Sequence, residues 1–200
     1  MSAVYSVPPA AGDSLPRKLF TRDEVQHMQD RGLFEGLRFE LIDGELIDKT
    51  GQNPPHAIAL SRIADWLFEC FGRRRVRVQL PVEASTPDQS RSLPEPDVAV
   101  IQAAFDDEWR HPRAEETLLI VEVADSTVQR DSTVKQALYA RAKAPEYWVL
   151  DIGERLLTIY RNPVGDRYVD VEQLGDDGVA SVAGQDAAIA VSALLPRKSN

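Results

Sequence analysis

One carboxylate stands where the sequence otherwise calls for apolar side chains. Glu122 lies inside the run TLLIVEV (residues 117–123), which is apolar and β-branched on both faces, as in a central strand that is buried on two sides. An ionised carboxylate in such a strand is costly unless a cation, a metal ion or hydrogen bonds compensate it. We therefore expect either a functional acid or, alternatively, a strand-end carboxylate that pairs with an arginine or faces solvent.

A second acid, Asp97, opens the preceding strand in the stretch Pro96-Asp97-Val98. Pro-Asp is also an ordinary turn pair, so Asp97 alone is a weak signal. If the two strands pair, Asp97 and Glu122 can converge on one divalent cation, because Mg²⁺ prefers oxygen ligands. Side-chain alternation places Glu122 on the same face of its strand as Leu118 and Ile120.

Four further residues could take part in chemistry, and each has a plain structural alternative. Lys135 follows Asp131 by one helical turn, which suits either a surface ion pair or an ammonium beside a scissile phosphate. Glu40 precedes a hairpin turn, where it could be an ordinary solvent-facing position. His56 begins a helix after Pro54-Pro55 and could simply cap or pack there.

Basic residues gather locally in a chain whose formal net charge is −9. Such an acidic average argues against non-specific coating of nucleic acid, which requires clustered basic groups. Local clusters nevertheless permit contact with a polyanion at one place, although a solvated surface is at least as good an interpretation. The candidates are Arg73, Arg74, Arg75, Arg77, Arg130 and Arg141.

These residues must be positioned by a mixed set of helices and strands. Thr21 and Glu24 form a capping-box pattern that opens a short helix, and Asp43-Gly44 predicts a hairpin between strands at 38–42 and 45–47. Apolar spacing predicts a helix over 55–71 and another over 131–143, the latter with Val134, Leu138 and Ala142 facing inward. Strands are expected at 76–82, 97–101, 117–123, 146–150 and 156–160, with an edge strand after Tyr168.

Length and composition fit one globular domain over residues 20–195, preceded by a flexible tail over 1–19 that is rich in Pro, Ala and Ser. The lone Cys70 excludes a disulfide scaffold or a cysteine-rich zinc module. Apolar runs are far shorter than the roughly 20 residues that span a bilayer. The first residues lack a secretion signal, so we expect a cytoplasmic protein with no membrane contact.

Taken in order, the motifs resemble the Uma-two family of restriction endonucleases, a branch of the PD-(D/E)xK nuclease superfamily. The resemblance covers roughly residues 20–195. The matching pieces are FELIDGE (39–45), His56 at a helix start, Pro96-Asp97-Val98, VEVADST (121–127), Asp131 with Lys135 and Tyr139, and EYWVLD (146–151).

The resemblance implies an α/β fold with a restriction-endonuclease-like core: a mixed sheet flanked by helices, with an N-terminal helix and β-hairpin. It also implies that Asp97 and Glu122, with the backbone carbonyl of Val123, hold Mg²⁺ or Mn²⁺. The superfamily lysine is expected two residues after Glu122, where this chain has Ala124. Lys135 on the following helix would replace it.

The resemblance further implies that Glu40 completes the catalytic set of Asp97, Glu122 and Lys135, with His56 and Asp131 as accessory residues. The expected function is metal-dependent hydrolysis of phosphodiester bonds in DNA, with backbone contacts from Arg73, Arg74, Arg75 and Arg130. Two alternatives stay open: a catalytically inactive module that binds nucleic acid or has a structural role, and a hydrolase of small phosphoesters. Cleavage of both DNA strands would favour a homodimer, because a two-fold axis supplies two sites.

Overall fold

The computed structural model describes residues 17–49, 53–103, 108–125 and 131–197. Six strands form the central sheet in the order β3-β4-β5-β6-β7-β8. Their bounds are Val76–Val78 (β3), Val98–Ile101 (β4), Thr117–Ala124 (β5), Glu146–Asp151 (β6), Leu156–Val164 (β7) and Arg167–Leu174 (β8). Only β5 and β6 pair in parallel, so the sheet is mixed as the sequence predicts.

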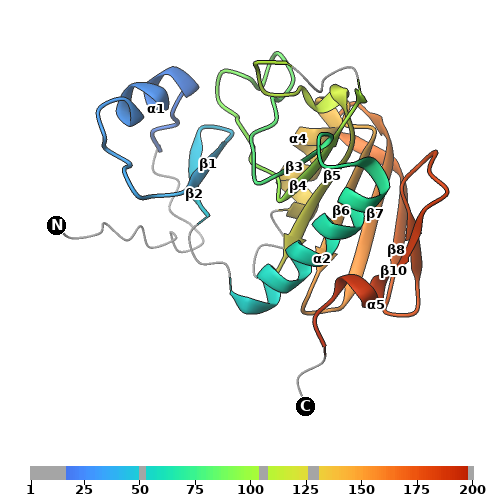
Figure 1. The fold of residues 1–200 in the computed structure, drawn as a ribbon. Coiled ribbons are helices and arrows are strands. Elements are labelled where there is room, and N and C mark those ends of the chain that lie inside the picture. The colour runs from blue at the N-terminus through green and yellow to red at the C-terminus, as the bar shows by residue number, and fades with distance from the viewer. Residues whose placement is uncertain (1–16, 50–52, 104–107, 126–130, 198–200) are drawn as a thin grey trace, which may run out of the picture.

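Helices cover both faces of this sheet (Figure 1). Helix α2 (Pro54–Phe71) packs on one face through Leu60, Ile63 and Leu67, against alternate residues of β4 and β5. On the other face, α4 (Gln136–Arg141) packs against Tyr147 and its neighbours. The predicted alternation of β5 holds for Ile120, on the α4 side, and Val121, on the α2 side. Leu118 is an exception, because it packs on the α2 side at the point where the β4–β5 register shifts.

The N-terminal part lies beside the sheet rather than in it (Figure 1). Thr21 and Glu24 form the predicted capping box of α1 (Arg22–Gln29). A separate hairpin follows, with β1 (Phe39–Ile42) antiparallel to β2 (Glu45–Asp48). Gly44 at the turn has φ +86°, and a Cβ there would lie 2.8 Å from the Cβ of Leu19, so glycine is required.

Short elements complete the chain. The C-terminal region adds a two-stranded sheet and a short helix that packs beside α2. Their bounds are Val179–Ser181 (β9), Ala188–Ala190 (β10) and Val191–Leu194 (α5), and a 3₁₀ turn, η2, covers Ala114–Glu116. The expected tail lies largely outside the described residues; of its last three residues, Arg17 pairs with Glu45 and Lys18 with Glu24.

Two sequence-based expectations are corrected. The strand predicted over 76–82 ends at Val78, because Gln79 adopts φ +53° and Leu80 is turned to solvent. The helix predicted over 131–143 begins as a π-helical turn, η3 (Asp131–Lys135), and only then continues as α4. Val134 is 39% exposed rather than inward-facing, whereas Lys135 is 2% exposed.

Candidate active site

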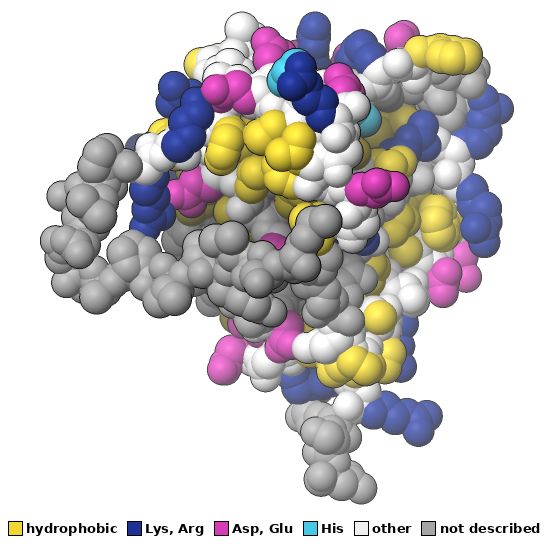
Figure 2. Space-filling view, turned by 90° about the vertical axis from the view of Figure 1, so that its left-hand side faces the viewer, with side chains coloured by type: hydrophobic (Ala, Val, Ile, Leu, Met, Phe, Trp, Pro, Cys, Tyr) yellow, Lys and Arg dark blue, Asp and Glu magenta, His cyan; other side chains and the backbone are white. Residues whose placement is uncertain are grey.

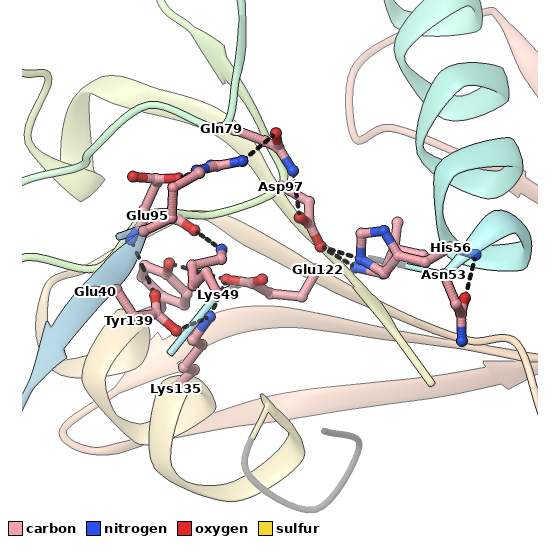
Figure 3. Close-up of polar contacts among 12 residues, drawn as sticks. Glu40, Lys49, Asn53, His56, Gln79, Glu95, Asp97, Glu122, Lys135 and Tyr139 are labelled. Atoms are coloured by element: carbon pink, nitrogen blue, oxygen red, sulfur yellow. Dashed lines mark hydrogen bonds and ion pairs between the residues drawn. The ribbon is translucent and has the colours of Figure 1, made fainter. Parts of the chain in front are cut away.

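Three buried carboxylates meet at one end of the sheet (Figure 3). Glu122 on β5 is 2% exposed, Asp97 immediately before β4 is 3% exposed, and Glu40 on β1 is 4% exposed. The antiparallel register pairs Val98 with Val121. Asp97 precedes Val98 and Glu122 follows Val121, so the two acids lie opposite each other next to this pair. The prediction that the strands of the two acids are neighbours is therefore confirmed.

Glu40 reaches this site from the separate β1–β2 hairpin. Its neighbours Leu41 and Ile42 are buried, and an isolated bridge joins Leu41 to Leu93. Glu40 Oε2 accepts a hydrogen bond from the backbone N–H of Glu95 at 3.1 Å. Glu40 is therefore not the solvent-facing residue that simple alternation in an exposed hairpin suggests.

Lys135 links two of the three acids. Its ammonium Nζ lies 2.8 Å from Glu40 Oε1 and 2.9 Å from Glu122 Oε1. A buried charge is tolerated only when an opposite charge pairs with it. Here two buried carboxylates pair with one buried ammonium. The alternative of an exposed surface pair between Lys135 and Asp131 is excluded by the burial of Lys135. The side chain of Asp131 lies outside the described residues.

Lys135 faces the acids from the buried face of the helix that continues after the π-helical turn. Lys135, Leu138, Tyr139 and Ala142 follow the i, i+3, i+4, i+7 spacing of one helix face, and all four are buried. The sequence predicts that this face begins at the apolar Val134, whereas in the structure it begins one residue later, at Lys135. Sequence analysis also gave Tyr139 no role at the site. Its hydroxyl lies 3.3 Å from Glu122 Oε1, and its spacing of four residues from Lys135 could have indicated this.

Asp97 has a separate set of partners. Asp97 Oδ2 accepts a hydrogen bond from the backbone N–H of Val123 at 2.9 Å and lies 3.3 Å from His56 Nε2. Burial alone raises the pKa of Asp97, but the contact with His56, the charge of Lys49 and the Val123 N–H outweigh it, so the pKa is lowered. Asp97 is therefore held as a carboxylate.

His56 is held by the start of α2. The Asn53 side chain caps this helix by accepting the His56 backbone N–H at 3.0 Å, and it also donates to Asp125 at the end of β5. The ring Nε2 faces Asp97, and the ring Nδ1 is buried without a hydrogen-bond partner. His56 thus contributes to the site through its ring, while its backbone takes the capping role.

Lys49 and Gln79 support the site from the hairpin and from the end of β3, and neither was singled out from the sequence (Figure 3). Lys49 donates to the backbone carbonyl of Glu95. Gln79 Nε2 lies 3.5 Å from Asp97 Oδ1, and Gln79 Oε1 accepts from Arg38 at 3.1 Å. These contacts join the hairpin to the loop that carries Asp97.

The chemistry of these donors suits a hard divalent cation, because the acids offer carboxylate oxygens. In this structure Lys135 forms ion pairs with Glu40 and Glu122, and the His56 ring faces Asp97. Among the residues that the structure describes, no three His, Cys, Asp or Glu side chains are grouped as metal ligands.

The predicted DNA-contacting arginines lie away from the acids. Arg73, Arg74 and Arg75 follow the last residue of α2, whereas His56 is near its first. Eighteen helical residues span about 27 Å. Arg75 donates to the Ile101 carbonyl at 3.0 Å, and Arg73 lies over the Phe68 ring. Arg130 falls outside the described residues.

Comparison with known proteins agrees with this fold and these motifs. Residues 22–191 match the family model "Uma2: Putative restriction endonuclease". The chain belongs to the Uma2 family. A solved structure from Anabaena variabilis ATCC 29413, described as "a putative nuclease belonging to DUF820", shares the fold with a TM-score of 0.67 and 14% identity, over 88% of this chain and 97% of that chain. A search of curated proteins finds no match.

Family membership confirms the resemblance seen in the sequence and gives this Uma2 protein a nuclease-like function at the family level. The structural neighbour confirms the expected mixed α/β core. In the described parts of this Uma2 chain, no helix combines the length and the apolar character needed to cross a membrane.

Proposed function

We propose that this Uma2 protein is a metal-dependent endonuclease that hydrolyses phosphodiester bonds in DNA. The observation that carries the proposal is the buried ammonium of Lys135 between Glu40 and Glu122, with the buried carboxylate of Asp97 beside Glu122 on the neighbouring strand. Burying four ionisable side chains together is costly for a fold, and such sites are strong candidates for function. The family match supports nuclease chemistry for this set.

We propose that Asp97 and Glu122, with the backbone carbonyl of Val123, would hold Mg²⁺ or Mn²⁺. A divalent cation supplies a water of lowered pKa and neutralises charge on a phosphate. The lowered pKa of Asp97 supports its part, because a ligand carboxylate must be ionised. The Val123 N–H fixes the direction of one Asp97 oxygen.

Lys135 takes the electrostatic role. Its ammonium is held on two sides by carboxylates, so its position is fixed before substrate arrives. A fixed positive charge in a buried site stabilises negative charge that develops on a phosphate and can orient an attacking water. Glu40 holds Lys135 in this place. Ala124 stands two residues after Glu122 and has no charge, whereas the Lys135 ammonium lies 2.9 Å from Glu122 Oε1.

DNA binding would need contacts beyond the acids. On the face shown in Figure 2, Lys and Arg side chains are interspersed with Asp and Glu rather than gathered into one basic patch. Arg73 and Arg74 follow the last turn of α2, about 27 Å from its first turn by helix length. Arg75 lies beside Ile101, about 13 Å along β4 from Asp97, so the three arginines could contact DNA only away from the cleavage point. We therefore expect weak binding with a shallow salt dependence, because few phosphate contacts release few counterions.

The test is cleavage of supercoiled plasmid DNA with and without Mg²⁺ or Mn²⁺. Wild-type protein should nick or linearise the plasmid only with metal, and Glu122→Gln should reduce the rate by on the order of a hundredfold or more. Glu154→Gln is the matched control, because Glu154 is exposed in the turn between β6 and β7. Equal rates for both variants would refute the assignment of Glu122.

The same assay separates the two other functions that the sequence allows. Plasmid binding without cleavage at any metal concentration would identify an inactive binding module. Turnover of bis-p-nitrophenyl phosphate without plasmid cleavage would identify a hydrolase of small phosphoesters. Either outcome would overturn the endonuclease proposal.

A further inference from the structure

Tyr139 brings a hydroxyl into the buried site beside Glu122. It lies one turn after Lys135 and is 1% exposed. Its OH is 3.3 Å from Glu122 Oε1, the same oxygen that lies 2.9 Å from Lys135 Nζ. Two donors on one oxygen fix the rotation of the carboxylate and turn its other oxygen, Oε2, away from them.

The ring of Tyr139 is itself held in place by other aromatic rings. Its centroid is 5.0 Å from that of Tyr147, which is fully buried on β6. Tyr147 in turn stacks on Tyr160 and Tyr168, at 5.7 and 6.4 Å. A ring packed in this way places its hydroxyl with little freedom.

Packing alone does not account for a tyrosine at this position. Phenylalanine would fill the same space, and a hydroxyl in a buried site is costly unless it is hydrogen-bonded. The hydrogen bond to Glu122 is an interaction that phenylalanine could not make. Removing a group that orients a metal-ligating side chain commonly lowers metal affinity.

We propose that Tyr139 is a positioning residue that sets the orientation of the Glu122 carboxylate for metal binding. Lys135 balances the negative charge of Glu122, and the Tyr139 hydroxyl fixes the rotation of the Glu122 carboxylate. This inference rests on the proposed function, in which Glu122 is a metal ligand.

Tyr139→Phe tests the hydroxyl while keeping the ring, and Tyr168→Phe is its matched control. Tyr168 belongs to the same aromatic group and is also buried, but its hydroxyl donates to the Ala144 carbonyl at 2.9 Å, away from Glu122. Both variants lose one buried hydroxyl bond and should lose similar stability. Mn²⁺ affinity, measured by titration calorimetry, should fall by about tenfold or more in Tyr139→Phe and stay unchanged in Tyr168→Phe.

A crystal structure of metal-free Tyr139→Phe supplies a second readout that needs neither metal nor activity. The Glu122 carboxylate should rotate from its wild-type position while Lys135 stays near. An unchanged carboxylate, or equal Mn²⁺ affinities of the two variants, overturns the role of Tyr139. Failure of wild-type protein to bind Mn²⁺ would instead count against the proposed function, and the crystal structure alone would then decide the role of Tyr139.

Discussion

Glu40 and Lys135 form a buried ion pair in which the carboxylate Oε1 and the ammonium Nζ are 2.8 Å apart. The two residues come from parts of the chain that share no sheet: Glu40 from the β1–β2 hairpin and Lys135 from the π-helical turn after β5. Their contact therefore does two things at once. It balances the charge of the Lys135 ammonium, and it connects the β1–β2 hairpin to the rest of the domain.

Replacing Lys135 should destabilise the protein strongly. Lys135→Met keeps most of the side-chain volume but leaves Glu40 and Glu122 facing each other without their shared cation. Breaking one partner of a buried ion pair costs about 3–5 kcal/mol. Urea unfolding should show this loss, and Lys143→Met, at an exposed lysine, should unfold like wild type. Equal midpoints for both variants would show that Lys135 is not buried with the acids.

Replacing Glu40 should loosen the hairpin more than the sheet. Glu40→Gln removes the charge that faces Lys135, so local opening of β1 and β2 becomes easier. Hydrogen exchange should rise by about tenfold or more at the amides of the hairpin, with no change in β5. Glu45→Gln is the control, since Glu45 lies on the same hairpin and pairs with exposed Arg17. Uniform change across hairpin and sheet would contradict a local role.

Local signals in the sequence predicted much of the fold. The Thr21–Glu24 capping box, the Asp43-Gly44 turn and the apolar run before Glu122 each depend on residues close in the chain, and the structure contains all three features. The sequence gives the pairing of the Asp97 and Glu122 strands only as a condition for a shared site, and the structure meets that condition.

The burial of Lys135 could not be predicted from spacing. Periodicity favours an apolar Val134 facing inward, whereas the ammonium of Lys135 one residue later is buried because Glu122 and the distant Glu40 both pair with it. The position of Arg73 to Arg75 relative to the acids could not be predicted either, because it depends on the direction in which α2 runs from Asp97. Interactions between distant segments decide both features.

The Asp88–Arg141 pair should give a pH-dependent contribution to stability. Burial raises the pKa of Asp88, but hydrogen bonds from Arg141, 3.0 Å away, and from Ser85 outweigh it, so the pKa is lowered from 3.8. A carboxyl whose pKa is lower in the folded state stabilises the fold above its unfolded pKa. That contribution is lost as pH falls through the folded value.

Thermal melts of wild type and Asp88→Asn from pH 6 down to about pH 2 would measure this contribution. The difference in Tm between the two proteins should be constant near pH 6 and should shrink below about pH 4. Because Arg141 is 32% exposed, the contribution should be within the range of ordinary surface pairs, at most about 1 kcal/mol. A difference that grows as pH falls would contradict the lowered pKa.

Metal should stabilise the folded protein through Asp97 and Glu122. A ligand that binds only the folded state adds about 2.7 kcal/mol at a hundredfold excess over its Kd. Mn²⁺ should therefore raise the Tm of wild type in a concentration-dependent way and should leave the Asp97→Ala/Glu122→Ala double variant unchanged. Asp65→Ala/Glu69→Ala is the control for charge, since it removes two exposed acids of α2 and should respond to Mn²⁺ like wild type. Equal shifts in all three proteins would mean that Mn²⁺ binds elsewhere. No shift in wild type would mean that the buried acids do not hold it.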